Sequence, residues 1–174
     1  MKVYKSWPVY RGRVIDLRVD EIDARGGGKR MVEVAEHRGG VVIVARPEPS
    51  AIVLVRQYRF AVRESLWEVP AGMLEEGEDP ALAARRELQE ETGYRARDVR
   101  FLWSAYSTPG FCDELLRFYV AEGLERGEQA LDENEDIEVR TFALDEAWAM
   151  VERDELRDAK SQIALAWARA HERL

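Results

Sequence analysis

The chain has 174 residues, of which 46% are hydrophobic and 34% charged, a balance typical of a globular protein rather than of a disordered one. A formal net charge of −8 argues against a general affinity for nucleic acid or for an anionic membrane. A single cysteine, Cys112, excludes an internal disulfide and fits a reducing compartment, and no apolar run approaches membrane-spanning length. We therefore expect a cytoplasmic protein.

The first forty residues form a pattern of their own. Two segments that alternate apolar and polar residues, 13–23 and 29–36, flank the sequence RGGG at 25–28, which is typical of an antiparallel β-hairpin. An isolated hairpin is only marginally stable and must pack on something else. The sequence therefore predicts an N-terminal β-hairpin layer, residues 1–40, before a main domain, residues 41–174.

Alternating or β-branched segments recur along the main domain. Residues 41–45 and 51–58 are continuous apolar runs, as expected for central strands that are covered on both faces. Three later strands and two helices are predicted at 99–106, 115–121, 138–144, 146–153 (capped by Asp145) and 160–173.

A further helix is predicted within residues 72–94 (GMLEEGEDPALAARRELQEETGY). Asp79 followed by Pro80 is a strong start signal, with the aspartate as N-cap and the proline at the first helical position. Gly93 is suited to the left-handed conformation that ends a helix.

Three glutamates, Glu87, Glu90 and Glu91, crowd the last two turns of this helix. There they face the negative end of the helix dipole at a cost of about 0.3–1 kcal/mol each, and Glu87 and Glu91 repel each other at the i,i+4 spacing. One interpretation is a solvated acidic face. The other is a cluster of hard oxygens for Mg²⁺, or Mn²⁺ as a substitute, which would also hold substrate phosphates.

The spacing of Gly72, five residues, Glu78, seven residues and then 86–94 (RELQEETGY) resembles the Nudix box at every defining position. The resemblance implies an α/β fold, a Nudix-type α/β/α sandwich with a mixed β-sheet. It also implies metal-dependent hydrolysis of a nucleoside diphosphate linked to another moiety. Arg86 is expected to pair with Glu78 or another carboxylate of the box and hold the loop against the helix.

The same resemblance assigns the metal ligands. They are the carbonyl oxygen of Ala71 and the carboxylates of Glu87 and Glu91, with Glu90 as a further ligand. A backbone carbonyl suits this role because it adds a hard oxygen without adding charge. Glu91 is assigned to catalysis as well as to metal binding.

Residues 56–59 (RQYR) are similar to a stretch of the ADP-ribose pyrophosphatases, a Nudix subgroup. The similarity implies that Arg59 contacts substrate, with Arg56 as a second candidate. A guanidinium suits a phosphate because its planar fork binds two oxygens at once.

Pro109, sixteen positions after Gly93, resembles a mark of the same subgroup. It makes the loop around it one wall of the substrate site, with Gly110 and Glu114 as candidate contacts. From the residues alone, Pro-Gly is a turn signal.

The acidic segment 127–136 lies where the resembled enzymes carry their catalytic base on a loop. Glu133 is the first candidate and Glu135 the second, and a solvated surface loop is the other interpretation. The resemblance also implies a homodimer joined by the N-terminal strands, which help bind the adenine end. Trp7 and Tyr10 are candidates to stack on the base, or are ordinary interface or core aromatics.

These patterns predict hydrolysis of ADP-ribose to AMP and ribose 5-phosphate. The partner is then a small-molecule nucleoside diphosphate, not nucleic acid or a membrane. Two alternatives stay open: the same chemistry on a nucleotide sugar, a dinucleoside polyphosphate, NADH or FAD, and a domain that senses ADP-ribose without cleaving it. The complete set of glutamates argues against the sensor, which has no need of carboxylates that destabilise a helix end.

Overall fold

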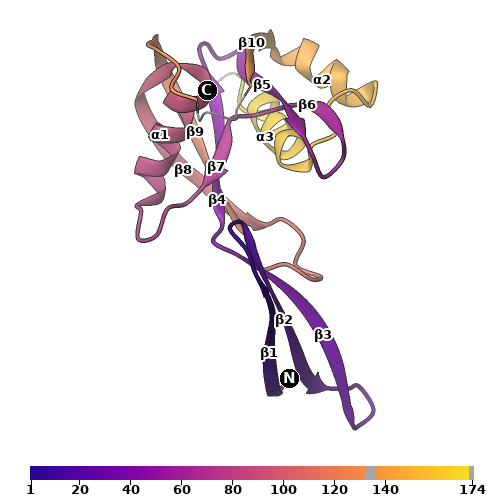
Figure 1. Ribbon diagram of the computed structural model, residues 1–174. Helices are drawn as coiled ribbons and strands as arrows, with labels where there is room; N and C mark the ends of the chain where they lie inside the picture. The colour runs from indigo at the N-terminus through magenta and orange to yellow at the C-terminus, as the bar shows by residue number, and fades with distance from the viewer. Residues whose placement is uncertain (132–135, 173–174) are drawn as a thin grey trace. The chain divides into compact units, whose positions relative to one another are not determined.

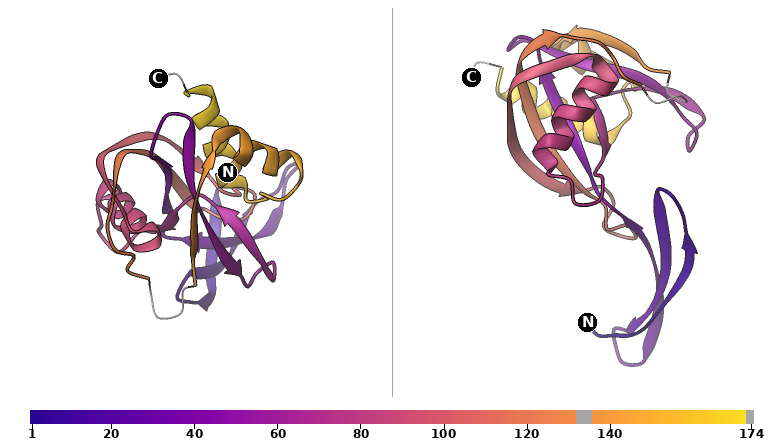
Figure 2. Two further views of the ribbon diagram at one scale, coloured as in Figure 1. Left: turned by 90° about the horizontal axis from the view of Figure 1, so that it is seen from above. Right: turned by 60° about the vertical axis from the view of Figure 1, so that its left-hand side comes forward.

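The structure is a computed structural model that describes residues 1–131 and 136–172. The chain divides into two compact units (Figures 1 and 2). Unit 1 contains Met1–Gly40 and Ser104–Leu116, and unit 2 contains Val41–Trp103 and Arg117–Leu174. In the part of the chain that the structure describes, no helix is both long and apolar enough to cross a membrane.

Unit 1 is built on a three-stranded antiparallel sheet in the order β1-β2-β3, made of Val3–Arg11, Ile15–Asp23 and Lys29–His37. The predicted antiparallel hairpin is confirmed as β2 and β3. The edge strand β1 was not predicted, because Pro8 in its middle cannot donate to a ladder and breaks the strand pattern. Pro8 is tolerated there because β1 pairs with β2 alone.

The loop between β8 and β9 is attached to the edge of β3 within unit 1. The amide of Ala35 donates to the carbonyl of Phe111 at 2.8 Å, and the amide of Asp113 donates to the carbonyl of Ala35 at 3.2 Å. The amide of His37 donates to the Asp113 carboxylate at 2.8 Å. These bonds fix the loop that contains Gly110 and Glu114 to the N-terminal sheet.

The described residues of unit 2 form two sheets and three helices. The sheets have the orders β10-β5-β6 and β7-β4-β9-β8. Their strands are β4 (Gly40–Arg46), β5 (Ala51–Arg59), β6 (Glu64–Glu68), β7 (Ala71–Met73), β8 (Tyr94–Tyr106), β9 (Leu115–Arg126) and β10 (Glu138–Ala143). The helices are α1 (Pro80–Thr92), α2 (Leu144–Glu152) and α3 (Ala159–Ala170).

Within unit 2, α1 lies on one side of the four-stranded sheet, and α2 and α3 lie on the other (Figure 1). The buried side chains of α1, including Leu88, pack with Val41 and Ile43 of β4. On the other side, Trp167 of α3 lies 5.9 Å from Trp103 of β8, measured between ring centroids. The predicted α/β fold, an α/β/α sandwich with a mixed sheet and an antiparallel N-terminal layer, is confirmed.

The two apolar runs form the centre of this unit. Every residue of β4 is buried, and so are the first five residues of β5. Both were predicted as central strands. The short strands β6 and β7 were not predicted, because five and three residues with mixed exposure give no clear period.

The predicted cap of α2 is wrong. This helix begins at Leu144, and Ala143 occupies the N-cap position without a side-chain hydrogen bond. Asp145 lies in the first turn, where a negative charge still suits the helix dipole, and its carboxylate pairs with Arg169 at 3.1 Å. In α3 the N-cap is Asp158, whose carboxylate accepts a hydrogen bond from the Ser161 amide.

The predicted ends of α1 are confirmed. Asp79 accepts from the amides of Ala81 and Leu82, and Gly93 ends the helix at φ 72°. A Cβ on Gly93 would lie 3.1 Å from the Gln129 nitrogen and 3.2 Å from the Gly127 oxygen.

We expect Gly93→Ala to lower the free energy of unfolding by about 1–2 kcal/mol, because a side chain is strained in the left-handed region. Urea denaturation measures this loss. Gly110→Ala is the matched control, since a Cβ there meets nothing within 4 Å. Equal stability of the two variants would contradict the expectation.

Candidate active site

The backbone between β6 and α1 lies directly against two glutamates of the helix. The amide of Ala71 donates to Oε2 of Glu91 at 3.0 Å, and Glu91 is only 5% exposed. A Cβ built on Gly72 would lie 1.9 Å from Cδ of Glu87. Glycine at this position therefore makes room for the Glu87 carboxylate. The fold thus brings the backbone of Ala71 close to Glu87 and Glu91, although the two glutamates lie 15 or more residues later in the sequence.

Arg86 joins the loop to the helix. Its guanidinium donates to both oxygens of Glu78 at 2.9 Å, to Glu87 at 2.8 Å and to Glu90 at 2.9 Å. The hydrogen bonds that Arg86 donates to Glu78, followed by the charge of Glu87, raise the pKa of Arg86 despite partial burial. The same hydrogen bonds lower the pKa of Glu78. The expected role of Arg86 as a clamp between loop and helix is confirmed.

This arrangement offers hard oxygens with one guanidinium among them. Across residues 1–131 and 136–172, no three His, Cys, Asp or Glu side chains are grouped so that they could hold a metal ion by themselves. Mg²⁺ usually binds through one or two carboxylates and keeps several waters or substrate phosphates. The buried carboxylate of Glu91, the space that Gly72 leaves for Glu87 and the oxygen-only chemistry fit such an ion.

Arg59 lies at the end of β5 and binds a buried carboxylate. Its Nε and Nη2 donate to the two oxygens of Glu68 at 2.7 and 2.8 Å. The side chain of Glu68 is 2% exposed and that of Arg59 is 39% exposed. The pKa of Arg59 is raised, first by the Glu68 hydrogen bonds and also by the charges of Glu68 and Glu91. Arg59 therefore lies within electrostatic range of a helix glutamate and keeps part of its guanidinium exposed.

Burial alone would raise the pKa of Glu68. The hydrogen bonds from Arg59, together with the charges of Lys160 and Arg59, outweigh that effect and hold the pKa below its ordinary value. Glu68 is thus a stable anion inside the protein. Neither Glu68 nor Lys160 was singled out from the sequence, because 92 residues separate them and no local pattern links them.

Arg56 takes a different position from Arg59. Its Nη1 lies 3.6 Å from Glu138 of the neighbouring strand, and both side chains are about half exposed. Because side chains alternate along a strand, Arg56 projects from the face of β5 opposite to Arg59.

Three other candidates belong to unit 1. Trp7 is half-buried on β1, with Nζ of Lys5 4.7 Å from its ring centroid. Oε1 of Glu114 lies 3.4 Å from Nδ1 of His37, and Gly110 is open to solvent. Glu133 and Glu135 lie outside the described residues.

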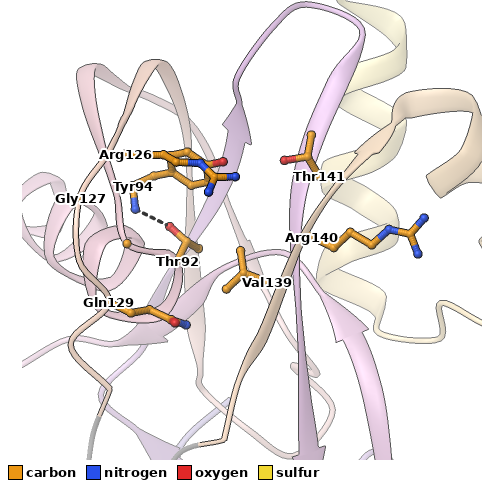
Figure 3. Close-up of a pocket in the computed structure, with 9 residues that line it drawn as sticks. Thr92, Tyr94, Arg126, Gly127, Gln129, Val139, Arg140 and Thr141 are labelled. Atoms are coloured by element: carbon orange, nitrogen blue, oxygen red, sulfur yellow. Dashed lines mark hydrogen bonds between the residues drawn. The ribbon is translucent and has the colours of Figure 1, made fainter.

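A polar pocket lies at the C-terminal end of α1 (Figure 3). Its cavity volume is about 240 Å³, and its lining includes Tyr94, Arg126 and Gln129. The Gln129 side chain donates to the carbonyl of Glu91 at 2.6 Å, and the Ala130 amide donates to that of Glu90 at 3.1 Å. This segment therefore satisfies carbonyls that a helix end leaves open. Sequence reasoning missed Gln129, because a single amide side chain gives no local signal.

Comparisons with known proteins agree with this geometry. The sequence model of the family described as NUDIX domain matches residues 36–165. The methanol dehydrogenase activator of Bacillus methanolicus is 39% identical over 99% of this chain and 95% of its own length. The ADP-ribose pyrophosphatase of Bacillus subtilis strain 168 is 37% identical over 95% of this chain and 91% of its own. A crystal structure titled ADP compounds hydrolase has the same fold, with a TM-score of 0.85, 24% identity, and coverage of 97% of this chain and 92% of that one.

Proposed function

This chain belongs to the NUDIX family, and on that premise we propose that it hydrolyses the pyrophosphate bond of ADP-ribose to AMP and ribose 5-phosphate. The observation that carries the proposal is the contact of the Ala71–Gly72 backbone with the carboxylates of Glu91 and Glu87. The similarity to an ADP-ribose pyrophosphatase along nearly the whole chain supports the choice of substrate.

The ligands for a divalent ion, Mg²⁺ with Mn²⁺ as a substitute, are the carbonyl oxygen of Ala71 and the carboxylates of Glu87, Glu90 and Glu91. A bound ion of this kind neutralises diphosphate oxygens and makes its bound water more acidic. The Arg86 guanidinium, which also binds Glu78 of the preceding loop, holds Glu87 and Glu90 in place. The Ala71 amide donates a hydrogen bond to the Glu91 carboxylate and fixes its position.

The other site residues act on the substrate and the attacking water. The exposed part of the Arg59 guanidinium binds diphosphate oxygens, because a planar fork fits two oxygens at once. Glu133, or Glu135 in its place, takes the proton from the attacking water as general base.

The nucleoside end of the substrate is bound by residues of unit 1. Trp7 stacks on the base, and Gly110 and Glu114 are further contacts. Arg56, which belongs to unit 2, is the second candidate for phosphate contact after Arg59. We further propose that two chains form a homodimer through the N-terminal layer, residues 1–40, and that residues 41–174 are the main domain of each chain. Four apolar side chains of the sheet that are more than half exposed support this: Val3, Val9, Tyr10 and Met31. A cytoplasmic location belongs to the same proposal.

The decisive test is a Mg²⁺-dependent turnover screen over ADP-ribose, GDP-mannose, NADH, FAD and diadenosine polyphosphates. We expect kcat/KM for ADP-ribose to exceed that of the others by about tenfold or more, a difference of about 1.4 kcal/mol in transition-state binding. Chromatography of the products should show AMP and ribose 5-phosphate.

A preference of the same size for another substrate of the screen would make the substrate assignment wrong and leave the proposed pyrophosphate hydrolysis in place. Binding of ADP-ribose without turnover would favour a sensing domain. Light scattering after size-exclusion chromatography measures the molar mass in solution and so tests the homodimer. The mass of a monomer would contradict it.

A second candidate comes from the Bacillus methanolicus relative, whose name describes activation of a methanol dehydrogenase. Adding this protein to a methanol dehydrogenase assay tests that activity. Activation that is lost in Glu91→Gln would join the two functions in one site, and activation that survives would separate them.

A further inference from the structure

The buried carboxylate of Glu68 is shared by two cations that come from different elements. Arg59 of β5 donates two hydrogen bonds to it, and Nζ of Lys160 in the first turn of α3 lies 2.5 Å from Oε2. The Lys160 side chain is itself largely buried. A carboxylate at this depth costs several kcal/mol unless cations and hydrogen bonds compensate it, so both partners matter.

Lys160 is held firmly where it meets Glu68. Asp158 caps α3 and also pairs with Nζ of Lys160 at 3.0 Å. The hydroxyl of Ser161 donates to Asp158 at 2.5 Å and accepts from the amide of Val69 at 2.8 Å. The first turn of α3 is therefore fastened to the end of the strand that carries Glu68.

Because Glu68 pairs with Lys160 as well as with Arg59, it offsets less of the attraction between the Arg59 guanidinium and a bound anion. With both cations in place, the negative charge of Glu68 is divided between Arg59 and Lys160. Without Lys160, the whole charge of a buried, weakly screened anion would act on Arg59. Arg59 would then be held more tightly against Glu68 and would attract phosphate oxygens less.

We propose that Lys160 is a positioning residue that acts through Glu68 to keep the Arg59 guanidinium oriented toward the diphosphate of the substrate and available to bind it. The inference rests on the proposed function, since it concerns the residue that binds the diphosphate there. Lys160 acts on binding of the diphosphate and not on the step that breaks the bond.

The test is a double-mutant cycle with Lys160→Met, Arg59→Ala and both changes together, using steady-state kinetics with ADP-ribose and Mg²⁺. Lys160→Met should raise KM about tenfold with little change in kcat, the size expected for one hydrogen bond between charged groups. In the Arg59→Ala background the same change should leave KM where it was, because the residue on which Lys160 acts is gone. Lys160→Arg should restore most of the wild-type KM.

The matched control is Arg157→Met. Arg157, like Lys160, pairs with a glutamate of β6, but that glutamate is the exposed Glu64 and not the buried Glu68. The control should keep the wild-type KM, and urea denaturation reports whether each variant is folded.

An equal rise in KM with and without Arg59 would overturn the proposal and make Lys160 a purely structural residue. An unchanged KM in Lys160→Met would overturn it as well. If the wild-type protein does not hydrolyse ADP-ribose, the proposed function fails separately. The same cycle is then measured by titration calorimetry with inorganic pyrophosphate and Mg²⁺, where the same tenfold pattern is expected in Kd and its absence overturns the proposal.

Discussion

Replacing Glu91 by glutamine is expected to lower kcat/KM for ADP-ribose by about a thousandfold. The change removes the negative charge of a proposed metal ligand, and a bound divalent ion stabilises the charge of the transition state by several kcal/mol. Glutamine has the same shape as glutamate and keeps an oxygen for the amide of Ala71, now 3.0 Å from Oε2. The change therefore removes the charge and leaves the local packing. The loss should appear in turnover and in the affinity for Mg²⁺, not in folding.

Steady-state kinetics, Mg²⁺ titration calorimetry and thermal unfolding measure the three quantities separately. Glu76→Gln is the matched control, because this glutamate belongs to the same motif and is exposed before α1. It should retain wild-type activity. If Glu91→Gln kept both its Mg²⁺ affinity and its turnover, the proposed metal site would be wrong.

Gly72→Ala should reduce kcat/KM about a hundredfold, because a misplacement of about 1 Å in a catalytic group can cost that much. The added Cβ would lie 1.9 Å from Cδ of Glu87 and 2.1 Å from both of its oxygens, closer than the 3.0 Å below which real Cβ contacts essentially do not occur. The carboxylate must move away by about 1 Å. It stands at the end of a flexible side chain, so the fold can adjust to the change.

Kinetics combined with urea denaturation distinguish displacement of Glu87 from unfolding. Met73→Ala, one position further along and 40% exposed, is the control and should behave like the wild type in both measurements. A fully active Gly72→Ala variant would show that Glu87 need not occupy the space above the glycine.

The sequence was most informative where local chemistry decides the structure. Asp79, Pro80 and Gly93 predicted the bounds of α1 to the residue, because capping depends on neighbours within one turn. The central strands followed from continuous apolar runs. The sequence was misleading at Asp145, where an acidic residue suits the first turn as well as the cap, so that the helix begins two residues earlier than predicted.

The parts that escaped prediction depend on distant segments. The ladder that makes β1 a strand comes from β2, and it overrides the signal of Pro8. The pairing of Lys160 with Glu68 depends on how α3 docks on β6, which no window of sequence contains. The box glutamates were identified by their spacing, but the space that Gly72 leaves for Glu87 became visible only in three dimensions.

The attachment of the 107–114 loop to β3 has a consequence for how related proteins can diverge. Two backbone hydrogen bonds hold it: the Ala35 amide donates to the Phe111 carbonyl, and the Asp113 amide donates to the Ala35 carbonyl. Such bonds do not depend on side-chain identity. The side chains of this loop can be exchanged through evolution while the two backbone bonds persist. The loop is therefore a place where side chains can change from one descendant to another without a new fold.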